Sequence, residues 1–257
     1  MNWKTRLFAS ALRFSTAIAL VSCICAQSFG AIIVTPVLRS QTFTTVSGAA
    51  AANVVVDIYG SANAGTQAVG AFGVTVSLTG PGARTAFVVT VPGAIDATVA
   101  ANEFRQLQNP TNVSTNTGAP LATQTFTFTR SRMAGFFTPA PENVNISSAA
   151  LPTTGQPVET ARLIGTIAFT VADNGVYAFT TAAATVTPPN SGALSGFLTH
   201  QGTSANPEFA PVAGGTTFNP GNFNITAVPE PSSMALLAVV GLAGFGWIRR
   251  KSKHTVS

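Results

Sequence analysis

Short runs of alternating or β-branched residues recur through the middle of the chain, and clusters of Gly, Pro, Asn and Ser separate them. Runs of this kind predict β-strands, and no long stretch shows the apolar period of about 3.6 residues that marks an amphipathic helix. The predicted strands are Ile33–Leu38, Asn53–Tyr59, Gly73–Leu78, Ala86–Val91, Gln124–Thr129, Arg162–Val171, Val176–Thr181 and Asn222–Thr226. We therefore expect an all-β domain.

The segment Gln124–Thr129 shows how such a strand would lie. Successive side chains of a strand point to opposite faces, so Phe126 and Phe128 would share one face and the threonines the other. One face would therefore be core and the other wet. Several such strands with turns between them predict a single antiparallel β-sandwich.

The connections between the predicted strands are of two kinds. Asp173-Asn174-Gly175 is a turn signal, because Asn and Gly tolerate positive φ, and it predicts a hairpin between the strands that flank it. Two stretches have few strand signals, Gln106–Pro120 and Thr187–Pro220. We expect both to be long surface loops.

Three of the runs also resemble strands of cohesin-type and carbohydrate-module jelly-roll sandwiches, namely Val54–Tyr59, Gly70–Leu78 and Gly165–Val171. The resemblance includes no diagnostic motif. It implies a β-sandwich of the jelly-roll or immunoglobulin/cohesin-like kind and leaves any ligand open.

Residues 1–30 have the layout of a secretory signal peptide. Lys4 and Arg6 precede a mostly apolar run, residues 14–26, which is too short to span the hydrocarbon core of about 30 Å as a stable helix. The small residues before Ala31 predict cleavage at that point. An uncleaved N-terminal anchor is the alternative.

The sequence Leu20-Val21-Ser22-Cys23 resembles the lipobox of bacterial lipoproteins, in which the cysteine becomes the lipidated first residue. If Cys23 is not lipidated, it leaves with Cys25 as part of the signal peptide. The exported domain then holds no cysteine and can form no disulfide.

The last segment, residues 228–253, combines a proline-rich motif, an apolar run and a basic cluster. These three parts are Pro229-Glu230-Pro231, residues 234–248 and Arg249-Arg250-Lys251. The apolar run would form about 22 Å of helix, which the snorkelling basic side chains can extend to a transmembrane helix. The basic cluster would stop translocation and stay in the cytoplasm. The domain of residues 31–227 would then lie outside the cytoplasmic membrane.

From Val228 to Lys251 this segment resembles the PEP-CTERM sorting domain. The resemblance implies an exosortase-like processing enzyme as partner, transient anchoring in the cytoplasmic membrane, and delivery to the cell surface or the extracellular matrix. Such systems are linked to exopolysaccharide and biofilm. The same tail is sometimes labelled as an ice-binding protein C-terminal domain, a label that describes nothing in the domain before it. A plain membrane anchor without processing is the alternative.

The basic residues do not form a nucleic-acid surface, although the chain has a formal net charge of +5. Seven of the 13 Lys and Arg residues lie in the two terminal segments. Residues 31–230 hold six arginines and eight acidic residues, a net charge of −2. Phosphate neutralisation needs clustered Lys and Arg, so we expect no binding of nucleic acid.

The exported domain has few groups that could carry catalysis. All lysines, tryptophans and cysteines lie in the terminal segments, which excludes Schiff-base lysines, phosphate-loop lysines and thiolate metal sites. The one histidine of the domain is His200, and Gly192-Ala193-Leu194-Ser195-Gly196 misses the nucleophile elbow by one place. We expect His200 to be a surface residue of a loop.

Carboxylate and aromatic residues do not select a site either. Tyr59 and Tyr177 are expected in strands at the edge of the core rather than on a sugar-binding platform. The acidic residues from which a glycosidase pair could be drawn show no selective spacing: Asp57, Asp96, Glu103, Glu142, Glu159, Asp173 and Glu208.

Taken together, the sequence predicts a non-enzymatic exported protein without catalytic residues, metal or cofactor. We expect a structural component of the cell surface or of a polysaccharide matrix, acting by self-association or by weak binding of polysaccharide. A dedicated carbohydrate-binding module is the alternative, and a secreted hydrolase is a third.

Overall fold

The computed structural model describes residues 30–46, 48–92, 104, 107, 112–116, 123–131, 143–156, 161–188, 191–202 and 207–227. Most of these residues lie in β-strands, and none lies in an α-helix. The prediction of an all-β domain is confirmed. The predicted signal peptide helix and the apolar run 234–248 lie outside the described residues. Within the described residues, no helix is long and apolar enough to cross a membrane.

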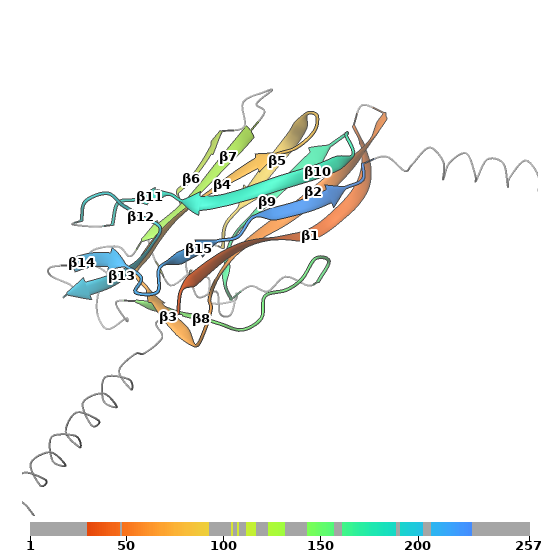
Figure 1. Ribbon diagram of the computed structural model, residues 1–257. Coiled ribbons are helices and arrows are strands. Elements are labelled where there is room, and N and C mark those ends of the chain that lie inside the picture. Colours follow the sequence, from red (N-terminus) through yellow and green to blue (C-terminus); the bar gives the residue numbers. More distant parts are fainter. Residues whose placement is uncertain are drawn as a thin grey trace, which may run out of the picture.

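The strands form two large sheets, which we call sheet I and sheet II, and two small ones (Figure 1). Sheet I has the order β15 (Thr216–Phe218), β1 (Ile32–Val46), β2 (Ala49–Ala62), β9 (Leu163–Val171), β5 (Arg84–Thr90). Sheet II has the order β14 (Pro207–Pro211), β13 (Phe197–Gly202), β4 (Ala71–Thr79), β10 (Gly175–Ala183), β16 (Gly221–Ile225). In this order β13 and β10 both pair with one edge of β4, at different parts of the strand. The other edge of β4 pairs with β7 (Thr123–Ser131), and β6 (Asn112–Asn116) lies beyond β7. The small sheets pair β3 (Thr66–Val69) with β8 (Val144–Ser147), and β11 (Thr185–Val186) with β12 (Leu194–Ser195).

The pairing within the sheets is antiparallel with one exception. The first residues of β1 pair in parallel with β15, from Ile32 opposite Thr216 to Val34 opposite Phe218. The predicted antiparallel pairing is therefore found throughout the described strands except at this edge. Here the last part of the chain returns to run beside its first strand.

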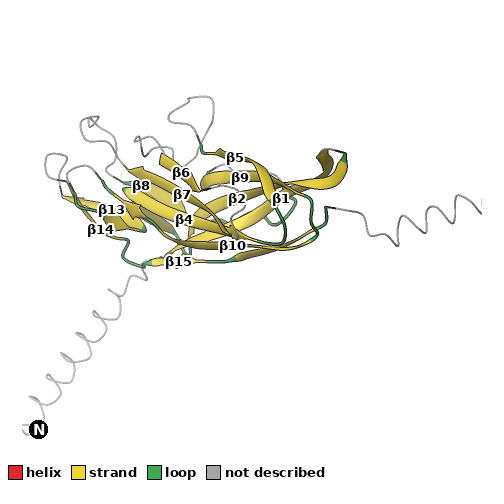
Figure 2. Cartoon of the chain, turned by 90° about the horizontal axis from the view of Figure 1, so that it is seen from above, coloured by secondary structure: helices red, strands yellow, loops and turns green. Residues whose placement is uncertain are grey.

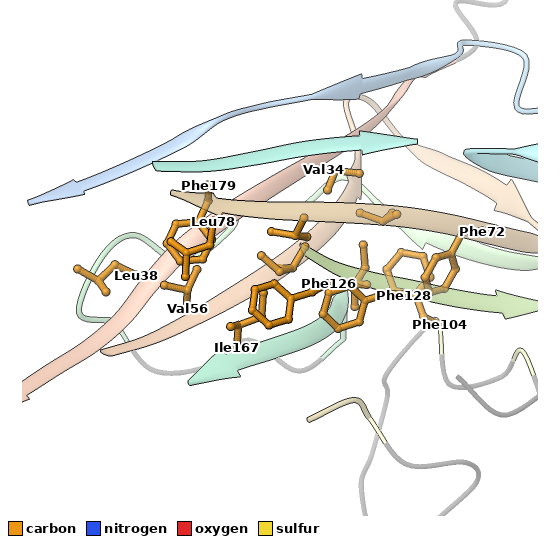
Figure 3. Close-up of a cluster of buried hydrophobic side chains, with 14 of the residues drawn as sticks. Val34, Leu38, Val56, Phe72, Leu78, Phe104, Phe126, Phe128, Ile167 and Phe179 are labelled. Atoms are coloured by element: carbon orange, nitrogen blue, oxygen red, sulfur yellow. The ribbon is translucent and has the colours of Figure 1, made fainter. Parts of the chain in front are cut away.

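The inner faces of the two sheets share one hydrophobic core (Figure 3). Phe126 and Phe128 of β7 are fully buried there, as the alternation predicted, while the threonines between them face outward. Rings from the two sheets meet in the core, since Phe169 of β9 lies 6.1 Å from Tyr177 and 6.0 Å from Phe179 of β10. These contacts hold the sheets face to face.

All eight predicted strands are present, but the two predicted long loops are not simply loops. Strand β6 lies within 106–120, and β12, β13, β14 and β15 lie within 187–220. These strands are short, and β14 begins at Pro207 and ends at Pro211. Proline cannot donate to a ladder and is tolerated at sheet edges, which is where β14 lies.

The predicted hairpin at Asp173–Gly175 is also wrong. Strand β9 belongs to sheet I and β10 to sheet II, so this turn carries the chain from one sheet to the other. A second connection, from β4 to β5, also crosses between the sheets, next to this turn. The Tyr177 hydroxyl joins the two connections, because it lies 3.0 Å from the carbonyl oxygen of Pro81 and 2.9 Å from the carbonyl oxygen of Asp173. Gly175 has a φ of 149°, so the prediction of a positive φ in this turn is correct. Only the predicted pairing of the two flanking strands is wrong.

The described chain begins and ends at opposite ends of the long axis of the domain (Figures 1 and 2). Ile32, at the start of β1, pairs with Ala62, and Ile225 pairs with Gly175 beside the crossing turns. We call the end near Ala227 the exit end, because the chain leaves the described domain there. The β1–β2 hairpin lies at the same end.

Candidate functional site

The exit end positions the start of the predicted sorting segment. The side chain of Asn174 accepts a hydrogen bond from the backbone N–H of Ala227 at 2.7 Å. The Gln41 amide donates to the carbonyl oxygen of Thr226 at 2.6 Å. The domain therefore holds the chain up to its last described residue, whereas Pro229, Glu230, Pro231, Arg249, Arg250 and Lys251 lie outside the described residues.

A groove opens at the opposite end of the domain, with a volume of about 870 Å³. The described residues that line it are all uncharged: Gly30, Ala64, Gly65, Thr66, Gln67, Ala68, Asn145, Thr199, Gln201, Pro211 and Ala213. The polar groups among them are three amides and two hydroxyls. Ligand sites of small molecules have volumes of the same order, about 300–1,000 Å³.

The groove lies where the β3–β8 pair meets β13 and β14. The Thr199 hydroxyl donates to the Ala68 carbonyl oxygen at 3.0 Å, and the Gly70 N–H donates to that of Leu198 at 2.7 Å. Alternation along β13 places Thr199 and Gln201 on the groove side and His200 on the other. The neighbouring elements thus fix the backbone that carries the polar groups of the groove.

His200 is not the surface loop residue that the sequence predicted. It lies in β13 with 8% of its surface exposed, and its ring meets the edge of Phe209 at 5.2 Å. The amide of Asn143 bonds both backbone groups of His200, accepting from N–H at 2.7 Å and donating to the carbonyl oxygen at 3.0 Å. Gly70 lies so close that an added Cβ would be 2.8 Å from the His200 Cβ. His200 is thus packed into the sheet.

Asp57 is the most buried acidic residue of the described chain, with 2% of its surface exposed. Arg39 bonds both of its oxygens, through Nε to Oδ2 at 2.7 Å and through Nη2 to Oδ1. The Thr166 hydroxyl donates to Oδ1 at 2.6 Å, and the Tyr59 hydroxyl donates to Oδ2 at 3.2 Å. A carboxylate with these partners is engaged in an ion-pair network between β1, β2 and β9, and we assign it a structural role.

Of the remaining candidate acids, the structure describes two, and they lie at different ends of the domain. Asp173 lies in the crossing turn and Glu208 is exposed in β14, while Asp96, Glu103, Glu142 and Glu159 lie outside the described residues. Among the described residues, no three His, Cys, Asp or Glu side chains form a group that could hold a metal ion.

Tyr177 is the titratable group with the largest perturbation at the crossing turns. Burial, and to a smaller extent the Asp173 carboxylate, raises the pKa of Tyr177 to about 12, while the Arg84 guanidinium opposes the shift. A phenol that ionises only at this pH remains a neutral hydrogen-bond donor at physiological pH. We therefore assign the Tyr177 hydroxyl the role of joining the two crossing connections by hydrogen bonds, rather than of transferring a proton.

The comparisons with known proteins concern the C-terminal segment. Residues 227–251 match the family model of the PEP-CTERM protein-sorting motif. This confirms the resemblance inferred from the Pro-Glu-Pro motif, the apolar run and the basic cluster. The motif implies export, anchoring in the membrane before processing, and processing by an exosortase-type system. A comparison with curated proteins finds no match to the chain.

The groove residues were not singled out from the sequence. Thr, Gln and Asn are common throughout this charge-poor chain, so their type marks no site. Phe197–Gly202, the segment that supplies Thr199 and Gln201, shows no regular alternation of apolar and polar residues and so gives no clear strand signal. The pairing of β3 with β8, which closes the groove, joins segments far apart in the chain and leaves no local signal.

Proposed function

We propose that this chain, which carries a PEP-CTERM sorting motif, is a non-enzymatic structural protein of the cell surface or of a polysaccharide matrix. The two facing sheets would form a β-sandwich of the jelly-roll or cohesin-like kind. After the signal peptide is removed, residues 234–248 would anchor the chain in the cytoplasmic membrane. An exosortase-type enzyme would then release it to the surface or the matrix.

The observation that carries this proposal is how directly the sorting motif follows the domain. The motif begins at residue 227, the last residue that the structure describes. Hydrogen bonds hold the chain through Ala227, so Pro229-Glu230-Pro231 follows within a few residues of a fixed point. A processing enzyme would then meet the motif at a defined distance from the domain.

The outer face of sheet II supports a role in association. Small hydroxyl residues from three adjacent strands line this face, with Thr75 opposite Thr127 and Ser77 opposite Thr125 and Thr180. The hydroxyl oxygens of Thr75 and Thr127 lie 3.4 Å apart. An array of hydroxyls without charge can exchange hydrogen bonds with water, with a polysaccharide or with a second copy.

The intact mass of the protein from membrane, surface and medium fractions tests the sorting proposal. The wild type is compared with a strain that lacks the exosortase, and with the variant Glu230→Ala in the wild-type strain. Glu208→Ala is the matched control, because Glu208 is an exposed glutamate of the domain. We expect loss of both ends in the wild type and the control, and retention of the C-terminal segment in the other two. Retention of residues 232–257 in every case would mean a plain anchor and would remove the support for a matrix role.

A second candidate function is the binding of a neutral saccharide in the groove. The observation that favours it is the lining, which offers amides and hydroxyls without charge, the groups that pair with sugar hydroxyls. Since none of the described residues that line the groove is aromatic, we expect little stacking and weak binding.

Titration with neutral and anionic oligosaccharides tests this second function. Gln201→Ala removes an amide from the groove, and Asn224→Ala removes an exposed amide from β16 as a matched control. Loss of one hydrogen bond to a ligand costs about 0.5–1.5 kcal/mol, which is a weakening of about 2- to 12-fold. Equal affinities of the two variants, or preference for anionic sugars, would count against the groove as a neutral-sugar site.

A further inference from the structure

The β1–β2 hairpin extends beyond the rest of sheet I at the exit end. The first residue of β2 that pairs with β9 is Ala52, opposite Val171, whereas the pairing of β2 with β1 begins at Ala49, opposite Val46. On its other side, β1 pairs with β15 only from Ile32 to Val34. The end of the hairpin is therefore a two-stranded ribbon without a neighbouring strand among the described residues.

This end of the hairpin is uncharged and exposes two large apolar side chains among its threonines. Residues 40–56 contain no charged residue, and the bulge at the base of the hairpin, between Leu38 and Ser40, is where the Arg39–Asp57 ion pair lies. Phe43 has 64% of its surface exposed and Val46 has 44%. Phe43 lies opposite Ala52 and on the core side of sheet I, but sheet II ends before it and leaves it uncovered by described residues.

Two exposed large apolar side chains lie on the ribbon, Phe43 on the core side of sheet I and Val46, three residues further along the strand, on the opposite face. The other two among the described residues are Val88 and Val176. Val176 lies next to Gly175, in the strand that follows the crossing turn, and so joins Phe43 and Val46 at the exit end. Val88, on the edge strand β5, is level with the base of the hairpin, since both Val88 and Val55 pair with Ala168.

The distances along the chain place this end near the predicted anchor. Gln41 lies beside Thr226, and Val46 lies five residues further along β1, about 17 Å at about 3.3 Å per residue. From Thr226 to Met234, where the apolar run begins, the fully extended chain spans at most about 29 Å. The headgroup layer occupies about 5–8 Å of that length. With the hairpin directed toward the membrane, a linker shorter than its full extension therefore brings the end of the hairpin to the lipid headgroups.

We propose that the end of the β1–β2 hairpin rests on the membrane surface while the chain is anchored, with Phe43 and Val46 in the headgroup layer. The inference rests on the proposed anchoring by residues 234–248. The hairpin would then fix how the domain stands on the membrane before processing. Because the hairpin carries no charge, the contact would not depend on anionic lipid or on salt.

A lipid surface is favoured over a second copy of the chain as the partner. The anchor keeps the bilayer within reach of the hairpin at all times, whereas a second copy has to arrive by diffusion. The free edges of the ribbon nevertheless make strand pairing between copies the main competing outcome.

Tryptophan quenching by lipids with brominated acyl chains tests the proposal. The anchored chain, with its signal peptide removed, is purified from a strain without the exosortase and placed in phosphatidylcholine vesicles. Its one remaining tryptophan is then Trp247, within the apolar run, which reports anchoring. Two further proteins carry Trp247→Phe together with either Phe43→Trp or Ala64→Trp. Ala64 is exposed just beyond the other end of the β1–β2 pair and serves as the control.

We expect the brominated lipid to quench Trp247 and the tryptophan at position 43, with a blue shift at 43, and to leave the one at position 64 unchanged. Added phosphatidylglycerol or salt should not alter the result. Quenching of Trp247 without quenching at position 43 would refute the hairpin contact and leave the anchor intact. No quenching of Trp247 would refute both. A shift at position 43 that depends on protein density in unbrominated vesicles, without quenching by brominated lipid, would show pairing between copies instead.

Discussion

The ion pair at the base of the hairpin permits a quantitative prediction about stability. Arg39→Met would leave the Asp57 carboxylate, with 2% of its surface exposed, to only two neutral donors, Thr166 and Tyr59. Asp57→Leu would instead leave the guanidinium of Arg39, whose side chain is 30% exposed and can turn toward water. The uncompensated charge is therefore better hydrated when the acid is removed than when the base is removed.

The magnitudes follow from this difference in burial. Removing one partner of a buried ion pair costs about 3–5 kcal/mol, and we expect Arg39→Met to fall in that range. For Asp57→Leu we expect about 2–3 kcal/mol, because the remaining charge is partly hydrated. The double variant removes both charges, and apolar replacements of such pairs are often close to neutral, so its cost should be lower than that of Arg39→Met alone.

Thermal and urea unfolding of the processed protein, followed by circular dichroism, measures these costs. For a domain of this size, 1 kcal/mol corresponds to about 2–4 °C, so Arg39→Met should lower the Tm by about 6–20 °C. Arg39→Lys, which keeps the charge and loses the two-point contact, should lie between the wild type and Arg39→Met. If Arg39→Met lies within about 0.5 kcal/mol of the wild type, the network does not contribute as argued.

Three further changes should have separable effects. Gly73→Ala should lower the free energy of unfolding in urea by about 1–3 kcal/mol, because the added Cβ would lie 2.3 Å from the Ala184 carbonyl oxygen. Gly192→Ala is the control and should be neutral, because an added Cβ there has no atom within 4 Å. Equal costs for the two variants would contradict this argument. Phe169→Ala should cost about 3–5 kcal/mol, since the ring packs against rings of both sheets, and a cost below about 1 kcal/mol would mean that the site collapses freely. The pKa of Tyr177 is raised to about 12, above its ordinary value of 10.0, so the unfolded chain loses this proton first and stability should fall as pH rises from about 10 to 12. Tyr177→Phe should flatten that part of the stability curve, and an unchanged slope would assign the effect to another group.

The strands were predictable because their signals are local. Phe126 and Phe128 alternate with threonines, and Val54 and Val56 lie in a run of β-branched residues, so burial of one face follows from the period alone. The same reasoning failed where strands are short. Leu194–Ser195 is too short to show a period, and its pairing with Thr185–Val186 is what defines it as a strand.

The crossing turn shows a different limit. Asp173-Asn174-Gly175 reverses the chain as its residues predict, but a reversal leads equally to a neighbour in the same sheet or to the facing sheet. What decides here is the contact with the second crossing, where Tyr177 bonds Pro81 and an added Cβ on Gly80 would lie 2.4 Å from the Tyr177 ring. That contact joins segments almost 100 residues apart and cannot be read from the turn itself.

The positions of the groove and the exit end bear on how an anchored domain would work. Strand β1 runs from Ile32, near the groove, to Val46, at the exit end, and 14 residues of strand span about 46 Å. If the exit end faces the membrane, the groove faces away from it, toward whatever lies outside the cell. An anchored chain should therefore bind a saccharide in the groove as well as the released chain does. Processing by the exosortase-type enzyme would then move the domain from the membrane to the surface or the matrix without changing access to the groove. The protein could therefore bind a saccharide both before and after processing.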